Sequence, residues 1–218
     1  MTHLVMFDID GTLVDSVGFD NRYYAEALRS VLNVEIDDTW RPYKHITDSG
    51  ILEELLASRE FDRPIDELRA AAKRKFVAAV RAHFARDPTA VREIAGAKAL
   101  FEHLRRLPGV RVAIATGGWA ETARLKLAAI GIDADTVAFA TSSDANERTR
   151  IMQLAEQRAL GSAVPVSRTY FGDGAWDKRA CAELGYRFVA VGRKVEHDLR
   201  LDDFRDRDAV LRCLAVEL

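Results

Sequence analysis

The stretch LVMFDIDGTL, residues 4–13, decides the fold. A short apolar run that is broken by carboxylates and a glycine is typical of a buried strand that ends in a turn. Gly11 lets the chain bend sharply, so that Asp8 and Asp10 can border one small space. Two carboxylates this close repel unless a proton or a cation lies between them, and Mg²⁺ is a cation that commonly binds carboxylates together with phosphate. The alternative is an ordinary surface turn, in which Asp and Gly are also common.

Length and composition limit the remaining possibilities. The chain has 218 residues, 48% of them hydrophobic and 30% charged, with a net charge of −2. These values are typical of a globular protein with one large domain, or with a core and a small insertion, and they favour neither nucleic-acid nor membrane partners. Two cysteines, Cys181 and Cys213, are too few for a disulfide framework. We therefore expect a cytoplasmic protein.

Beyond the first strand, the hydrophobic pattern alternates between strand-like and helix-like segments. The strand-like segments are residues 110–115, 136–140, 169–171 and 188–191. Strands that alternate with helices predict an α/β fold with a doubly wound parallel sheet, to which residues 4–7 also belong.

One long segment does not fit this alternation. Residues 16–88 show helical spacing of apolar side chains, such as Tyr24 with Leu28 and Ile51 with Leu55. We therefore predict a core made of residues 1–15 and 89–218, with an inserted helical domain at 16–88.

Three polar turns follow predicted strands, at residues 8–12, 116–118 and 172–177. In an open parallel sheet, ligands bind beyond the carboxyl ends of the strands, so these turns can share one site. Each turn alone is also common loop chemistry. Together they suit phosphoryl transfer, because a carboxylate can attack phosphorus and a bound cation can screen the charges.

The expected roles follow from this chemistry. Mg²⁺ would bind Asp8 and Asp173, with Asp177 as a direct or water-mediated ligand. The Thr116 hydroxyl and the Gly117 backbone N–H would donate to the phosphoryl oxygens.

These turns resemble the motifs of the haloacid dehalogenase-like (HAD) hydrolases, which have a Rossmann-like core. The resemblance covers the whole predicted core, and the helical insertion resembles the C1 cap of the phosphoglycolate phosphatase-like branch. It implies that Asp8 is the nucleophile and that Asp10 is the general acid and base, with its backbone carbonyl on Mg²⁺. It also implies that Asp173 and Asp177 bind the metal and that Thr116 carries the second motif.

The third motif of the family is normally a lysine, and residues 142–151 contain none. Arg148 is the best substitute by position, at the predicted start of a helix, and Arg150 is the second candidate. Arginine can neutralise the same charge and bind phosphate through two nitrogens, but it occupies more room than lysine.

The resemblance implies a Mg²⁺-dependent phosphatase that forms an aspartyl-phosphate. A sugar phosphomutase similar to β-phosphoglucomutase remains an alternative, because it shares every core motif, and so does a binding protein without turnover. Among cap residues, Lys44, His45 and Thr47 are candidates for reading the substrate, although each could equally be a solvated loop residue. We expect a small phosphorylated metabolite as substrate, and a monomer or a homodimer.

Overall fold

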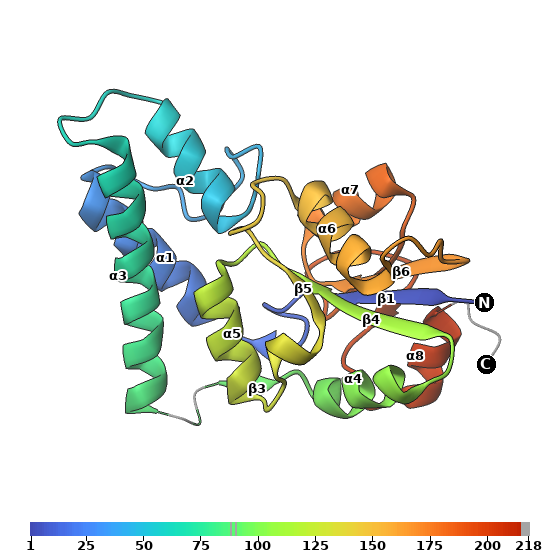
Figure 1. The fold of residues 1–218 in the computed structure, drawn as a ribbon. Helices are drawn as coiled ribbons and strands as arrows, with labels where there is room; N and C mark the ends of the chain where they lie inside the picture. Colours follow the sequence, from blue (N-terminus) through green and yellow to red (C-terminus); the bar gives the residue numbers. More distant parts are fainter. Residues whose placement is uncertain (88, 90, 215–218) are drawn as a thin grey trace.

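The computed structural model describes residues 1–87, 89 and 91–214. Its centre is a six-stranded sheet with the order β5-β4-β1-β6-β7-β8, and every pairing in it is parallel (Figure 1). The strands are β1 (His3–Phe7), β4 (Val110–Ala115), β5 (Ala138–Ala140), β6 (Ser167–Gly172), β7 (Arg187–Val191) and β8 (Arg200–Leu201). The predicted α/β class with a doubly wound parallel sheet is confirmed. Within the described ranges, no helix combines the length and the apolar character needed to cross a membrane.

The two faces of the sheet bury alternate residues of β1. Val5 and Phe7 pack in one apolar cluster with α4 (Ala97–Arg106), α5 (Ala120–Ala129) and α8 (Arg207–Cys213). Leu4 and Met6 pack in a second apolar cluster, on the other face, with α6 (Arg148–Leu160) and α7 (Ala175–Leu184). Figure 1 shows α6 and α7 above the sheet and α4 and α8 below it. A strand buried on both faces needs an unbroken apolar run, which explains the composition of residues 4–7.

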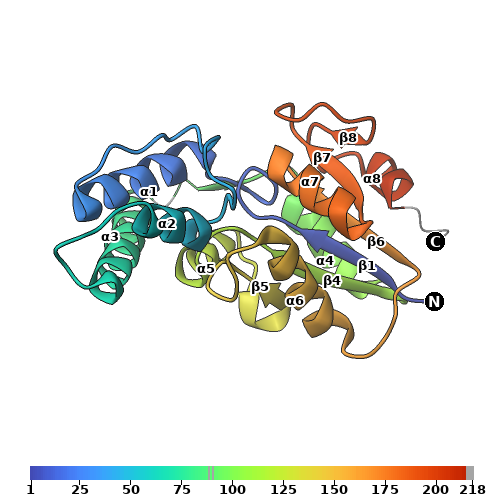
Figure 2. The ribbon, with the colours of Figure 1, turned by 90° about the horizontal axis from the view of Figure 1, so that it is seen from above.

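The inserted helices form a separate apolar cluster. They are α1 (Val17–Leu32), α2 (Asp48–Ala57) and α3 (Ile65–Arg86). Their buried side chains pack against one another and against Trp119, which lies at the start of α5. Figure 2 shows the three helices beyond the end of the sheet that is opposite the N-terminus. This is the end at which the parallel strands finish, so the helices cover it.

A two-stranded antiparallel sheet joins the two connections between the main sheet and these helices. Strand β2 (Val14–Asp15) pairs antiparallel with β3 (Arg92–Glu93), with Val14 opposite Glu93. The predicted insertion, residues 16–88, begins just after β2 and ends shortly before β3.

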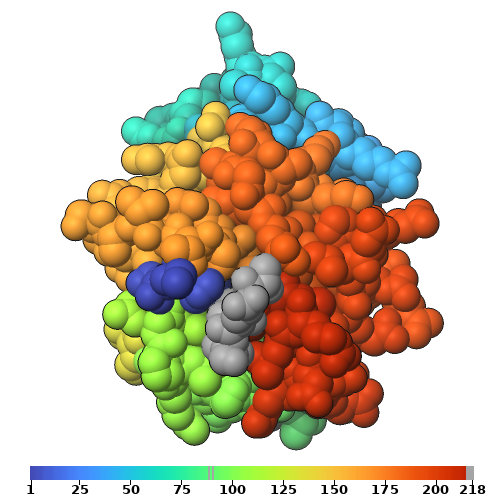
Figure 3. All heavy atoms as spheres, turned by 90° about the vertical axis from the view of Figure 1, so that its right-hand side faces the viewer, coloured from blue at the N-terminus to red at the C-terminus, as the bar shows by residue number. Residues whose placement is uncertain are grey.

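The opposite end of the sheet carries the N-terminus. Figure 3 views this end, and the first residues (blue) lie between the green and orange segments of the chain. This arrangement agrees with the pairing of β1 with β4 on one side and with β6 on the other.

Candidate active site

Three strand ends bring the predicted motifs to one edge of the sheet. Asp8 follows β1 directly, Thr116 follows β4, and Asp173 follows β6. Because β1 is hydrogen-bonded to both β4 and β6, these ends are neighbours in space. All three side chains are buried and line the same cavity.

A cluster of three buried carboxylates lies at the strand ends, and two of the three line this cavity. Asp8, Asp173 and Asp177 each place an oxygen within 4.8 Å of the others. Burial raises the pKa of Asp8 well above its ordinary value, and the nearby Asp177 raises it further. Burial also raises the pKa of Asp173 to about 6, against the effect of Lys194. Three hard oxygen ligands that repel one another form a donor set suited to a divalent cation such as Mg²⁺.

Gly11 makes this cluster possible. Its φ of 74° lies in the left-handed region, where a side chain is strained. A Cβ atom at this position would also overlap Oδ2 of Asp173. The turn after β1 can therefore approach the end of β6 only because residue 11 has no side chain.

Arg148 reaches into the same cluster from the first turn of α6. Its Nη1 lies 3.3 Å from Oδ1 of Asp8 and 3.2 Å from Oδ1 of Asp177. Its Nη2 donates to the carbonyl oxygen of Ile46, in the loop before α2, at 3.4 Å. Burial lowers the pKa of the Arg148 guanidinium, but the neighbouring carboxylates outweigh this effect and raise it. Arg150, the second candidate, is exposed.

Asp10 is held by a buried lysine. Nζ of Lys126, on α5, lies 2.7 Å from Oδ1 of Asp10 and 2.6 Å from Oδ1 of Asp20, on α1. The hydroxyl of Ser16 also donates to Oδ1 of Asp10. Lys126 has no exposed surface, so one ammonium group joins a predicted catalytic carboxylate of the core to a carboxylate of the inserted helices.

Sequence reasoning missed Lys126, Asp20 and Lys194. Lys194 follows β7, and its Nζ lies 2.6 Å from Oδ2 of Asp173. Lys126 did carry a signal, because it lies three residues after Ala123 and four before Ile130, both buried. A charged residue on the buried side of a helix usually has a buried partner.

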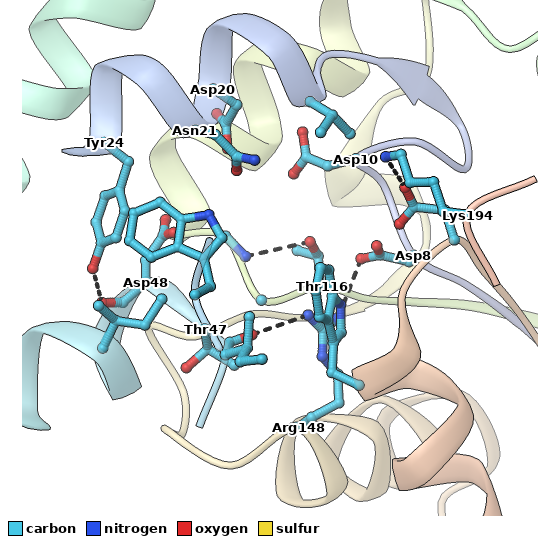
Figure 4. Close-up of a pocket in the computed structure, with 18 residues that line it drawn as sticks. Asp8, Asp10, Asp20, Asn21, Tyr24, Thr47, Asp48, Thr116, Arg148 and Lys194 are labelled. Carbon is cyan, nitrogen blue, oxygen red and sulfur yellow. Dashed lines mark hydrogen bonds and ion pairs between the residues drawn. The ribbon is translucent and has the colours of Figure 1, made fainter. Parts of the chain in front are cut away.

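The cavity between the strand ends and the inserted helices is small, with a volume of about 90 Å³. Figure 4 shows Asp8, Asp10 and Arg148 on one side of it, and Tyr24 and Asp48 on the other. The lining residues from the inserted segment are Val17, Asp20, Asn21, Tyr24, Trp40, Ile46, Thr47, Asp48 and Ile51.

The three residues of the inserted segment that were predicted to determine substrate specificity do not all line the cavity. Thr47 lines the cavity, and its hydroxyl donates to the carbonyl oxygen of Asn146 at 2.7 Å. Lys44 and His45 line a separate depression, where Nε2 of His45 lies 3.7 Å from a carboxylate oxygen of Glu147. The structure therefore brings Thr47, but neither Lys44 nor His45, to the cavity.

The second motif connects the sheet with the inserted helices. Thr116 lies at the end of β4, and the carbonyl oxygen of Gly117 accepts the backbone N–H of Asp48 at 2.8 Å. The predicted phosphate donors thus lie where α2 meets the core.

Comparisons with known proteins agree with this geometry. The model of the haloacid dehalogenase-like hydrolase family matches residues 5–181. No curated protein matches the chain.

Several solved structures share the fold. CbbY from Rhodobacter sphaeroides, in complex with xylulose-(1,5)bisphosphate, has 19% identity and a TM-score of 0.70, over 94% of this chain and 96% of that one. β-Phosphoglucomutase from Clostridium difficile has 15% identity and a TM-score of 0.73, over 98% and 97%. A predicted phosphoglycolate phosphatase from Haemophilus somnus has 19% identity and a TM-score of 0.65, over 96% and 98%.

Identities this low show a shared fold, whereas the family model covers most of the sequence and includes the motifs that meet at the cavity. The expected family is confirmed: the chain belongs to the haloacid dehalogenase-like hydrolases and is a hydrolase enzyme.

Proposed function

We propose that the protein is a Mg²⁺-dependent phosphatase that hydrolyses a small phosphate monoester through an aspartyl-phosphate on Asp8. The observation that carries this proposal is the meeting of Asp8 with two further buried carboxylates and Arg148 at the strand ends. A carboxylate nucleophile beside an anionic phosphate needs cations, and this site combines a donor set for a divalent ion with a fixed guanidinium group.

The metal would be held by the side chains of Asp8, Asp173 and Asp177, and by the backbone carbonyl of Asp10. When bound, it would neutralise phosphate charge and favour attack at phosphorus. Three buried carboxylates with raised pKa values fit this assignment, because a divalent cation removes their mutual repulsion.

The side chains of the protein carry the two chemical steps. In the first, an oxygen of Asp8 attacks phosphorus, and the bond between phosphorus and the leaving oxygen breaks while Asp10 gives that oxygen a proton. In the second, Asp10 takes a proton from water, whose oxygen attacks phosphorus and breaks the bond to Asp8. Inorganic phosphate leaves, and both carboxyl groups return to their initial states.

Other groups position the phosphoryl group and exclude bulk water. In this proposal, the Thr116 hydroxyl, the Gly117 N–H and Arg148 bind the phosphoryl oxygens as charge spreads over them. The inserted helices cover the cavity, and such a cover keeps solvent from the reacting atoms.

The test is phosphate release from a panel of small monoesters and from p-nitrophenyl phosphate, with Mg²⁺ and with a chelator. We expect release that needs the metal and that falls by at least about a thousandfold in Asp8→Asn. The matched control is Asp62→Asn, which makes the same change at an exposed position. Release that persists in Asp8→Asn would contradict the proposed nucleophile, and conversion of a sugar phosphate into an isomer without phosphate release would establish a mutase.

A further inference from the structure

The charges that line the cavity are divided between its two ends. Two cationic side chains line it, Arg148 and Lys194, and both belong to the core and lie against the carboxylates of the phosphate site. Among the described residues of the inserted segment, those that line the cavity include two carboxylates, Asp20 and Asp48, and no lysine, arginine or histidine. The end that would face the leaving group is therefore acidic.

These two carboxylates have few counter-charges. Lys126 lies 2.6 Å from Asp20, but it is also paired with Asp10 and does not line the cavity. Oδ2 of Asp48 accepts the backbone N–H of Trp119 at 2.8 Å. Burial raises the pKa of Asp20 to about 6 and that of Asp48 well above its ordinary value, although Lys126 acts against both shifts. Groups that already resist ionisation cannot act as partners for a further anion, and an anion placed among them would find, in the part of the chain that the structure describes, no cation free to bind it.

The other lining residues of the acidic end suit a small carbon skeleton that carries hydrogen-bond donors. Tyr24, Trp40 and Ile51 supply aromatic and aliphatic walls, and Asn21 supplies an amide. The rings of Tyr24 and Trp40 lie 5.6 Å apart at an angle of 51°. Apolar walls with a few carboxylate acceptors are the usual means of recognising hydroxyl or ammonium groups on a small carbon skeleton.

From this arrangement, and resting on the proposed phosphatase function, we infer that the preferred substrate is the monophosphate of a small alcohol that carries hydroxyl or amino groups and no second anionic group. Phosphoglycolate and xylulose bisphosphate, which are linked by name to solved structures of the same fold, each carry a second anion. Both are therefore expected to be poor substrates.

The test compares esters that differ in the charge of the distal group. Phosphoethanolamine is matched with phosphoglycolate, glycerol 3-phosphate with 3-phosphoglycerate, and xylulose 5-phosphate with its 1,5-bisphosphate. In each set we expect kcat/KM to be at least about 100-fold higher for the ester without the second anion. An anionic member that equals or exceeds its partner in all three sets would overturn the inference.

Charge variants test whether the inserted segment causes this preference. Asn21→Lys places a cation in the acidic end, and we expect kcat/KM for phosphoglycolate to rise by about tenfold or more relative to phosphoethanolamine. Asp48→Asn keeps an oxygen for the Trp119 N–H, removes an ionisable group from the acidic end and should shift the same ratio in the same direction. Ser58→Lys adds a cation at an exposed position near the end of α2 and is the matched control. An unchanged ratio in folded Asn21→Lys and Asp48→Asn would show that these carboxylates do not select the substrate.

The two proposals can fail separately. Hydrolysis of p-nitrophenyl phosphate that does not depend on Asp8 would contradict the phosphatase mechanism, whatever the preference among esters. Asp8-dependent hydrolysis with phosphoglycolate as the best substrate would retain the mechanism and contradict only the inferred substrate class.

Discussion

At the scale of single residues, Arg148, the proposed third-motif residue, depends on the absence of a side chain at Gly117. A Cβ atom on Gly117 would lie 2.5 Å from Nη2 of Arg148 and 3.2 Å from the carbonyl oxygen of Ile46. Arginine is longer and wider than lysine, and the missing side chain at residue 117 provides the space that it occupies. If Arg148 takes the place of the lysine, as we propose, Gly117 is the neighbour that makes room for the larger side chain.

This dependence predicts the behaviour of Gly117→Ala. The added methyl group should displace the Arg148 guanidinium and lower kcat/KM by about 10- to 100-fold, because small displacements of a charged group at the reacting centre are costly. The measurement is steady-state kinetics on p-nitrophenyl phosphate for the wild type, both single variants and Gly117→Ala/Arg148→Lys.

The double variant is the informative control. The shorter lysine leaves room for the methyl group, so we expect the loss caused by Gly117→Ala to be smaller in the Arg148→Lys background than in the wild type. Losses that simply add would show that the methyl group acts elsewhere, for example on the backbone N–H of residue 117.

The buried Lys126 leads to a prediction about stability. Lys126→Met removes the cation between Asp10 and Asp20 and leaves two carboxylates without their partner, so we expect the free energy of unfolding to fall by about 3 kcal/mol or more. Urea denaturation at neutral pH measures this change. Lys98→Met, on the exposed side of α4, is the matched control.

A second substitution separates the charge effect from simple loss of packing. In Lys126→Met/Asp20→Leu one of the uncompensated carboxylates is gone, and part of the lost stability should return. A double variant that is less stable than Lys126→Met by the full cost of Asp20→Leu alone would contradict the proposed role of this ion pair.

Among single residues, the sequence predicted those that follow strands and missed those that meet through tertiary packing. Asp8, Thr116 and Asp173 stand directly after apolar runs, so their convergence follows from the rule for parallel sheets. Lys194 is 21 residues beyond Asp173, and only the path of the chain after β7 brings the two together. Arg148 could be chosen over Arg150 by position alone, because only a residue at the very start of α6 points to the strand ends.

At the scale of elements, a helix or strand could be predicted only where it was long enough to show a hydrophobic period. The apolar run at residues 4–7 lies in β1, and α1, α2 and α3 lie within residues 16–88, where helical spacing was predicted. Strands β2, β3 and β8 have two residues each, which is too short for any period, and none of them was predicted. The expected strand 136–140 is shorter, because residues 134–136 form a 3₁₀ turn before β5.

The contact between α6 and β6 predicts a pH effect on stability. Nε and Nη2 of Arg168 donate to Oε1 of Glu156 at 3.0 and 2.9 Å, and the Tyr186 hydroxyl donates to Oε2. Burial raises the pKa of Glu156, but these hydrogen bonds outweigh it, so the pKa in the folded protein lies below the ordinary value. The stabilisation is therefore complete above the pKa of the unfolded chain, about 4.3, and is lost as the pH falls through the lower folded value.

Glu156→Gln should accordingly lower the free energy of unfolding by about 1 kcal/mol at pH 7 and by less at pH 3.5. The measurement is urea denaturation of both proteins between these pH values. Glu67→Gln, at an exposed position of α3, is the control for loss of a surface charge. An equal loss at both ends of the pH range would mean that the carboxylate charge is not what stabilises this contact.

At the scale of the whole molecule, the inserted helices contact the core through packing and hydrogen bonds around Trp119. Its ring packs in the apolar cluster of the helices, 5.6 Å from the ring of Tyr24 and 5.9 Å from that of Phe76. Its Nε1 donates to the hydroxyl of Ser49 at 2.7 Å, and that hydroxyl donates to the carbonyl oxygen of Ser142, also at 2.7 Å. A core residue thus completes the cluster of the insertion, which no local sequence pattern could reveal.

This connection predicts that Trp119→Phe loosens the cover of the active site. Phenylalanine keeps an aromatic ring in the cluster but loses the N–H that Ser49 accepts, a change of about 1 kcal/mol and about fivefold in the opening equilibrium. We expect amides of α2 to exchange their hydrogens about fivefold faster, while those of α6 are unchanged, and KM for a small ester to rise. The matched control is Tyr186→Phe, which removes a hydroxyl donor from the core and should affect α6 but not α2. Equal acceleration in both helices of Trp119→Phe would mean that the molecule opens as one unit and that the cover does not move independently.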